Sequence, residues 1–271
     1  MSYQQQLMIA IAAAEAASHV IMRHYQEFEK IPDAAVDITT AADIAAQDVI
    51  VERLRAAFPD DGIHAEEDRP YMAEIPKRND RFWVIDPIDG TRGFARKTDE
   101  FSVMIGLVVD GAPVVGVVAE PCWDRLTWAI LGGGCWTQMG EERGPRQVTT
   151  HDNGTLSTAL FVMSRGSRIS DDEYREFFGF RDIRRSYSSG VKLAAVARGE
   201  VDAYVSGYHE YSDYDMCAGQ ILVTEAGGQV SDFTGAEIIY PQPGTTITRG
   251  IVASNGTLHP EILERTRKKP W

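Results

Sequence analysis

Two carboxylates three residues apart are the groups in this chain best placed to do chemistry. Asp86 and Asp89 end an aromatic and aliphatic run that reads as a strand, and Gly90 and Thr91 follow. Such a strand end can aim both carboxylates at one point and offer the carbonyl of Ile88 between them, which is the all-oxygen set that Mg²⁺ prefers. The amides after Asp89 can hold an anion, because glycine allows close backbone approach. A metal beside an anion cradle indicates phosphoryl transfer, although Asp, Pro and Gly also form ordinary turns.

Two other acidic segments help to decide between a turn and a site. Upstream, a short apolar stretch leads to the adjacent pair Glu66 and Glu67. Neighbouring side chains of an extended chain point to opposite faces, so only one of the two is expected to face a given site. Downstream, Asp215 stands where a helical pattern begins, and its simplest role is to cap that helix.

Taken together, the three segments resemble the inositol monophosphatase superfamily, a group of Mg²⁺-dependent and often lithium-sensitive phosphatases. The resemblance rests on A-E-E at 65–67, D-P-I-D-G-T at 86–91 and Y-D-M-C-A-G at 214–219. Ala65 replaces a family glycine, and Tyr214 replaces a family tryptophan but keeps an aromatic wall. The resemblance covers nearly the whole chain. It implies an α/β (α+β) fold layered as an αβαβα sandwich of the inositol monophosphatase and fructose-1,6-bisphosphatase type.

The resemblance also implies roles for single residues. Thr91 would orient or deprotonate the attacking water, and Asp43, at the end of the stretch 37–43, would stand behind Thr91; taken alone, Asp43 is a helix cap or a solvated residue. Glu66 would act in catalysis as well as in metal binding, with Glu67 in support. The implied ligands of two or three Mg²⁺ ions are Glu66, Asp86, the Ile88 carbonyl, Asp89 and Asp215. Mn²⁺ would substitute for Mg²⁺, whereas Li⁺ and Ca²⁺ would inhibit.

The expected chemistry explains why so many acids gather. Hydrolysis of a phosphate monoester needs stabilisation of the order of 20 kcal/mol, and two metal ions about 4 Å apart can supply much of it. Carboxylates that cluster without a cation repel one another and raise each other's pKa. Nothing in the chain demands a covalent nucleophile. We therefore expect in-line attack by a metal-activated water, with inversion at phosphorus.

Three segments favour one branch of the superfamily, the 3′(2′),5′-bisphosphate nucleotidases. They are S-S-G-V-K at 188–192, V-M-S-R at 162–165 and the Arg92 that follows the central motif. Lys192 and Ser189 at a helix N-terminus would bind a second phosphate; without the resemblance, Lys192 would be a surface lysine. The expected substrate contacts are Gly90, Thr91, Ser189, Lys192 and Asp215. The favoured reaction is hydrolysis of 3′-phosphoadenosine 5′-phosphate to AMP and phosphate.

Other functions stay open at this point. Inositol 1-phosphate and histidinol phosphate are alternative substrates, because the stretch 211–214 matches neither common pattern. A different class is a catalytically silent, metal-binding regulatory protein of the same fold. Loss of an acid at position 66, 86, 89 or 215 would favour that class, and none is lost.

The composition argues against several kinds of partner. The 271 residues carry a net charge of −13, and the isoelectric point is about 4.9, which disfavours nucleic acid. Three cysteines without a C-x-x-C pair predict a reducing cytoplasm. No stretch reads as a membrane span, and 7–22 reads as a helix rather than a signal peptide. We expect a small phosphorylated metabolite as partner, no nucleic acid, no membrane, and a monomer or homodimer.

The apolar pattern divides the chain into helices and strands. We predict helices over 3–29, 42–58, 171–178, 190–198, 215–226 and 260–268, and strands over 82–86, 101–109, 113–119, 126–130, 160–163, 202–205 and 250–253. The stretch 132–136 reads as a turn into another strand. Asp110-Gly111-Ala112 is a hairpin signal. The polar, glycine-rich stretch near 140–155 predicts a boundary. It separates an N-terminal α+β subdomain (1–145), with most metal ligands, from a C-terminal α/β subdomain (146–271), with Asp215 and substrate contacts.

Overall fold

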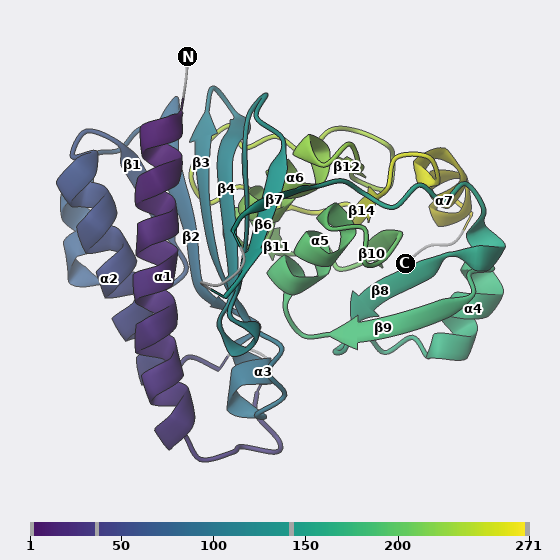
Figure 1. Ribbon diagram of the computed structural model, residues 1–271, viewed down its shortest axis with the longest axis horizontal. Coiled ribbons are helices and arrows are strands. Elements are labelled where there is room, and N and C mark those ends of the chain that lie inside the picture. Colours follow the sequence, from purple (N-terminus) through teal and green to yellow (C-terminus); the bar gives the residue numbers. More distant parts are fainter. Residues whose placement is uncertain (1–2, 36–37, 141–143, 269–271) are drawn as a thin grey trace.

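The computed structural model describes residues 3–35, 38–140 and 144–268 as five stacked layers (Figure 1). Two helices cover the outer face of a seven-stranded sheet, and two more lie between that sheet and a second one. A last pair of helices covers the far face of the second sheet. The predicted αβαβα sandwich is confirmed.

The first layer holds α1 (Gln4–Glu27) and α2 (Ala41–Ala57). Their small apolar residues pack against each other and against the first sheet in one buried cluster. Contrary to our expectation, α1 is long and apolar enough to cross a membrane by length and composition. Its buried face includes Ala10, Ala14 and Ala17, which are fully buried, so α1 packs as a core helix does.

The first sheet runs in simple chain order, and only its first pair of strands is parallel. A turn at Asp110 and Gly111, both with positive φ (50° and 83°), joins the third and fourth strands. This confirms the predicted hairpin. The strands are β1 (Gly62–Ala65), β2 (Arg81–Asp89), β3 (Ser102–Val109), β4 (Ala112–Glu120), β5 (Arg125–Ile130), β6 (Cys135–Met139) and β7 (Arg146–Val148).

The middle layer is formed by α5 (Ser189–Ala197) and α6 (Cys217–Glu225). Glycine in the sheet lets α6 approach closely: a Cβ on Gly106 would lie 2.5 Å from Cys217 Sγ. Cys217 is fully buried and acts as a small apolar residue there. This packing brings the start of α6 against the first sheet.

The second sheet has the order β12 (Gln229–Ser231), β14 (Ile251–Ser254), β10 (Ala203–Ser206), β8 (Leu160–Ser164) and β9 (Asp182–Ser186). Its far face is covered by α4 (Asp171–Phe178) and α7 (His259–Thr266). A separate short pair joins β11 (Tyr211–Ser212) to β13 (Thr246–Ile247). The predicted helices and strands are confirmed to within a few residues, whereas β1, β7, β9, β11, β12 and β13 were not among the strands that we predicted.

The predicted boundary at residue 145 falls between strands of the same sheet. β7 follows it and still pairs with β6. Residues 141–143 of the polar stretch that suggested this boundary lie outside the described residues. The division into two subdomains stays a prediction, and the sheets favour placing it after Val148.

One buried histidine should make stability depend on pH. His259 is 1% exposed, and its two ring nitrogens each lie 2.8 Å from a serine hydroxyl, of Ser231 and of Ser254. Burial lowers its pKa to about 4, whereas the pKa in the unfolded chain is about 6.5. Below pH 6.5 the unfolded chain therefore takes up the proton first. The stabilisation is complete above that pH and is lost as the pH falls through about 4.

We expect the titration of His259 alone to lower the free energy of unfolding by about 3 kcal/mol between pH 7 and pH 4. Urea unfolding across this range measures it. A His259→Gln variant should lose about 3 kcal/mol less than the wild type, and exposed His19→Gln should follow the wild type. If the free energy of unfolding of His259→Gln fell with pH as much as that of the wild type, the prediction would be contradicted.

Candidate active site

The central motif folds as a strand, a turn and a helix. The register between β2 and β3 shifts between Asp86 and Asp89. The chain then turns at Gly90, whose φ is +87°, and α3 (Thr91–Ala95) begins. A Cβ on Gly90 would lie 2.8 Å from the carbonyl oxygen of Glu100, so no larger residue fits this turn. The turn brings the end of β2 against the loop that carries Ser188.

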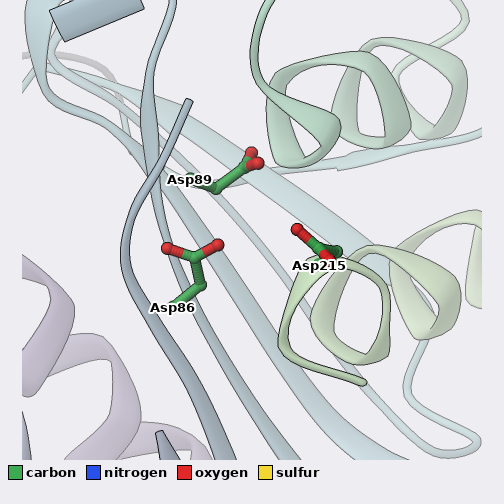
Figure 2. Close-up of side chains that lie close together, drawn as sticks. All are labelled: Asp86, Asp89 and Asp215. Atoms are coloured by element: carbon green, nitrogen blue, oxygen red, sulfur yellow. The ribbon is translucent and has the colours of Figure 1, made fainter. Parts of the chain in front are cut away.

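Three carboxylates from two distant parts of the chain meet at this turn. Asp86 and Asp89 come from β2, and Asp215 ends the short 3₁₀ helix η4 (Asp213–Asp215), just before α6. One oxygen of each lies within 4.8 Å of the others (Figure 2). The helix-cap alternative for Asp215 is wrong for α6, because Met216 holds that position. Instead, Asp215 accepts a 2.8 Å bond from the Ser212 amide, which leaves its other oxygen for the cluster.

The electrostatics of the cluster fit a cation. Burial, and then the charges of Glu66 and Asp89, raise the pKa of Asp86 well above its usual range. Burial and the charge of Asp89 raise the pKa of Asp215 to about 7. Among the described residues, buried Asp86 Oδ1 has no hydrogen-bond partner. A divalent cation would satisfy that oxygen and offset the repulsion, so the donor set fits Mg²⁺.

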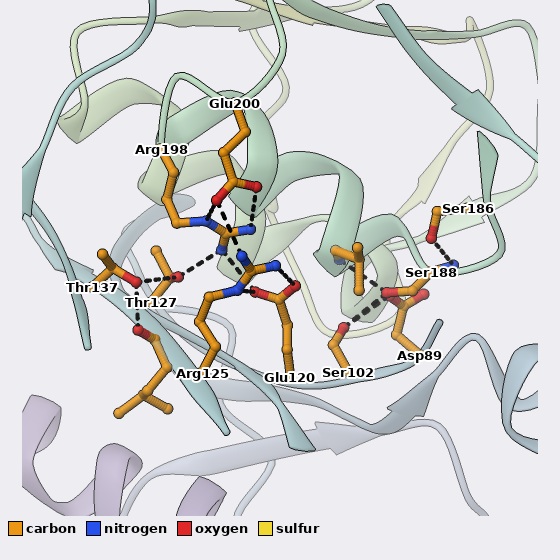
Figure 3. A network of polar contacts seen from close by, with 12 residues as sticks. Asp89, Ser102, Glu120, Arg125, Thr127, Thr137, Ser186, Ser188, Arg198 and Glu200 are labelled. Atoms are coloured by element: carbon orange, nitrogen blue, oxygen red, sulfur yellow. Dashed lines mark hydrogen bonds and ion pairs between the residues drawn. The ribbon is translucent and has the colours of Figure 1, made fainter. Parts of the chain in front are cut away.

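Asp89 has a second role that the sequence did not suggest. Its carboxylate accepts hydrogen bonds from the amides of Ser189 (3.0 Å) and Gly190 (2.6 Å). It also accepts from the hydroxyls of Ser102 (3.1 Å) and Ser188 (Figure 3). These amides form the N-terminus of α5. We predicted that Ser189 and Lys192 bind a second phosphate at this helix end; in the structure the two amides bond to Asp89 instead, so such contacts would have to come from the side chains. Asp89 Oδ1 accepts only the Ser189 amide within the described chain, so a lone pair remains for a cation.

Glu66 stands next to the three carboxylates, directly after β1. Part of Glu66 is exposed and lines the pocket. Its carboxyl group is nevertheless surrounded by protein atoms, and this burial raises its pKa to about 8. The charges of Asp43 and Asp215 raise the pKa to a smaller extent. Glu67 lines the same pocket, and its Oε1 accepts a hydrogen bond of 3.1 Å from the Thr39 hydroxyl. Both glutamates therefore reach the pocket, although we expected only one of them to face the site.

Thr91 and Asp43 lie in contact under the cluster. Thr91 Oγ1 lies 3.0 Å from Asp43 Oδ1 and 2.8 Å from the Ile88 carbonyl oxygen. The other oxygen of Asp43 accepts from the amide and the hydroxyl of Thr40, which completes a capping box at the start of α2. Burial raises the pKa of Asp43 to about 6. Asp43 therefore both caps a helix and holds Thr91, while Asp37, which opens the same stretch, lies outside the described residues.

A Thr91→Val variant should keep the fold and lose most of its turnover. Valine matches threonine in shape but cannot bond Asp43 or the Ile88 carbonyl. We expect kcat to fall about 100-fold or more, the scale of a lost general-base contact, with a smaller change in KM. Steady-state kinetics measure this. Thr91→Ser keeps the hydroxyl and serves as the control; equal losses in both variants would rule out the role of the hydroxyl.

Lys192 and Ser189 both line the pocket, but Lys192 is not at the surface. Its side chain is 1% exposed, and Nζ lies 3.3 Å from the Ser186 carbonyl oxygen and 3.4 Å from that of Tyr187. It also lies 4.9 Å from the centre of the Tyr204 ring. Burial lowers its pKa to about 8. The surface-lysine alternative is therefore wrong.

The pocket above these groups has a volume of about 920 Å³. The acid cluster forms part of its lining. The lining also includes Arg92, Arg168 and Tyr187, and the tyrosines Tyr208 and Tyr214. Arg168, Tyr187 and Tyr208 were not predicted. They come from loops, where no periodic pattern marks a residue as part of a site.

The sequence of this chain matches the model of the inositol monophosphatase family over residues 2–270. The chain belongs to the inositol monophosphatase family. It is 36% identical over 204 residues to the 3′(2′),5′-bisphosphate nucleotidase CysQ of Salmonella typhimurium, which covers 74% of this chain and 78% of that one. It is 31% identical over 265 residues to the histidinol-phosphatase of Mycobacterium tuberculosis, 96% of each chain.

Solved structures of the inositol monophosphatase family have the same fold. The IMPase of Thermotoga maritima superposes with a TM-score of 0.80 and 28% identity over 97% of each chain. The family and the relatives named here are phosphoric monoester hydrolases, and this is the enzyme class of the chain. Their names cover different substrates, so the family decides the reaction class and leaves the ester open.

Proposed function

We propose that this protein is a Mg²⁺-dependent phosphomonoesterase that acts on a small phosphorylated metabolite. One observation carries the proposal: oxygens of Asp86, Asp89 and Asp215 lie within 4.8 Å of one another, and Asp86 Oδ1 is buried without a partner in the described chain (Figure 2). Glu66 and the Ile88 carbonyl would complete the ligands of two or three ions. When bound, Mg²⁺ lowers the pKa of water and neutralises charge on the phosphoryl group.

The protein's own residues have distinct tasks in this proposal. Thr91 holds the attacking water through its hydroxyl, and Asp43 fixes that hydroxyl and accepts its hydrogen bond. Gly90 lines the pocket, and its backbone would lie next to the phosphoryl group. Glu66 lines the same pocket as Thr91 and supports activation of the water. The water oxygen forms a bond to phosphorus in line with the ester oxygen, and the P–O bond to that oxygen breaks. The proton that water loses balances the proton that the leaving alcohol gains, so no phosphoenzyme is needed.

For the substrate we propose 3′-phosphoadenosine 5′-phosphate, cleaved to AMP and phosphate. The identity to CysQ supports it, and so does a pocket of about 920 Å³, much larger than a sugar monophosphate fills. Ser189, Lys192 and Asp215 would contact the substrate. Inositol 1-phosphate and histidinol phosphate are the alternatives, the latter supported by the relative from M. tuberculosis. A silent regulatory protein is disfavoured because every acid of the cluster is present.

The conditions of activity belong to the same proposal. Mn²⁺ should replace Mg²⁺, and Li⁺ and Ca²⁺ should inhibit. The three cysteines are free, which agrees with a cytoplasmic protein. We propose a monomer or a homodimer.

The test is release of phosphate with Mg²⁺, and then with EDTA, from four esters. They are 3′-phosphoadenosine 5′-phosphate, inositol 1-phosphate, histidinol phosphate and fructose 1,6-bisphosphate. Mg²⁺-dependent release that is fastest on the nucleotide is the expected result. Faster release from another ester would keep the metal site and overturn the substrate. No release from any ester would support a silent protein.

A further inference from the structure

One wall of the pocket carries positive charge that the chemistry at the acid cluster does not use. Arg92 follows Thr91 on α3, and Arg168 lies in the loop after β8; both line the pocket together with Tyr187. The guanidinium carbons of Arg92, Arg96 and Arg165 each lie within 5.8 Å of the centre of the Tyr187 ring. We call Arg92, Arg168 and Tyr187 the basic wall. It shares no residue with the carboxylate cluster of Asp86, Asp89 and Asp215.

The charges of the basic wall are unevenly compensated. Arg165 forms a two-bond ion pair with Glu100, and Glu100 also accepts from the Tyr187 amide at 3.4 Å. Within the part of the chain that the structure describes, neither Arg92 nor Arg168 has a carboxylate within ion-pair distance. Arg92 Nε is withdrawn from water and has no acceptor among those residues. A buried donor without a partner is costly, so an arriving acceptor would be bound there.

The basic wall is also shaped for one kind of group. Arginine offers a planar fork of donors that matches phosphate oxygens in pairs. Tyr187 keeps the guanidinium of Arg92 in place by stacking, and Glu100 fixes the loop that carries Tyr187. Arg168 is exposed and lines the same pocket. Its loop passes close to Arg92, because a Cβ on Gly166 would lie 3.8 Å from a terminal nitrogen of the Arg92 guanidinium.

We propose that Arg92 and Arg168 form a second anion site, which binds a phosphate of the substrate that is not cleaved. This inference rests on the proposed function and narrows it to small esters that carry two phosphates. A substrate with one phosphate leaves the two guanidiniums without a counter-charge. Thr91 and Arg92 are consecutive residues of α3 and both line the pocket, so the retained phosphate would be bound within the same pocket as the reacting one.

The first test compares two esters that differ only in the retained phosphate: adenosine 3′,5′-bisphosphate and adenosine 3′-phosphate. The wild type should prefer the bisphosphate in kcat/KM. Arg168→Gln and Arg92→Gln should each lower that preference at least about tenfold, the scale of one lost bond to a charged group. Arg96→Gln is the matched control, because Arg96 contacts the same ring but does not line the pocket; the preference should survive in it. Equal preference in all four proteins would overturn the inference.

The second test separates this inference from the phosphatase proposal. Calorimetry in EDTA measures binding of AMP and of adenosine, because without metal the cluster of carboxylates cannot bind phosphate and the contribution of the basic wall can be tested by substitution. The wild type should bind AMP at least about tenfold more tightly than adenosine, and Arg168→Gln should lose this difference. If the wild type binds both alike, the second site is refuted even when phosphate release is fast. If the difference stands while no ester is hydrolysed, the site is supported and the phosphatase proposal fails.

Discussion

An Asp86→Asn variant should be almost inactive and yet, without Mg²⁺, more stable than the wild type. Asp86 is buried among like charges, and one of its oxygens has no partner within the described residues. Asparagine keeps the shape and removes a charge that burial and its neighbours disfavour. The same change removes a proposed metal ligand. We expect activity to fall about 1,000-fold or more, the upper scale of one lost electrostatic contact in a transition state.

Calorimetric melting with EDTA and with Mg²⁺ checks both halves of this prediction. In EDTA, Asp86→Asn should melt at least about 2 °C above the wild type, which corresponds to about 1 kcal/mol. Adding Mg²⁺ should raise the melting temperature of the wild type and raise that of the variant less, because a ligand stabilises only what binds it. The exposed Asp33→Asn is the control. An active variant, or one with an undiminished Mg²⁺ response, would contradict the prediction.

Asp89 is a poorer probe of the metal site than Asp86. Its carboxylate accepts the two amides at the start of α5, and an amide in its place would turn an N–H group toward those donors. An Asp89→Asn variant would therefore lose stability along with activity. Loss of function in that variant would not isolate the metal.

The second large effect concerns stability alone. Glu120 is fully buried at the end of β4 and binds two arginines (Figure 3). It takes bonds of 2.8 and 2.6 Å from Arg125 and one of 2.7 Å from Arg198, which is itself 1% exposed in its side chain. Glu200 binds both arginines from the other side. Glu120→Gln leaves Arg125 and Arg198 with Glu200 as the remaining carboxylate of this buried network. We expect the substitution to lower the free energy of unfolding by about 3–5 kcal/mol.

Urea unfolding of Glu120→Gln at pH 7 measures this loss. The control is Glu264→Gln, which breaks an exposed pair with Lys268 and should change the free energy of unfolding little. Activity of the folded Glu120→Gln protein should stay near that of the wild type, since the network lies away from the pocket lining. Similar stabilities of the two variants would show that burial does not strengthen this network.

Local sequence patterns predicted much of the fold because helix caps and tight turns depend on residues that are neighbours in the chain. The capping residues Thr40 and Asp43 mark the start of α2, and Asp110-Gly111 adopts the positive φ values that a tight hairpin needs. β9 escaped prediction because its sequence, D-I-R-R-S, is mostly polar and lies at a sheet edge, where no apolar face is required. The other missed strands are two to four residues long.

The candidate site was predictable in part for a different reason. Asp86, Asp89 and Gly90 are close in sequence, so a strand end alone places them together. Nothing local says that Asp215 joins them, and only the family resemblance named it. The burial of Lys192 and the bonds from α5 to Asp89 depend on packing between the two sheets. Neither segment contains a sequence pattern that predicts such contacts.

The bonds between Asp89 and α5 also provide a natural reporter. The amides of Ser189 and Gly190 end on a carboxylate that belongs to the first sheet, so they can exchange with deuterated solvent only when the two sheets part or α5 frays. A cation on Asp89 would hold that carboxylate in place. Deuterium uptake at these two positions should therefore slow when Mg²⁺ is added, and its rate would record how often the two halves of the molecule separate.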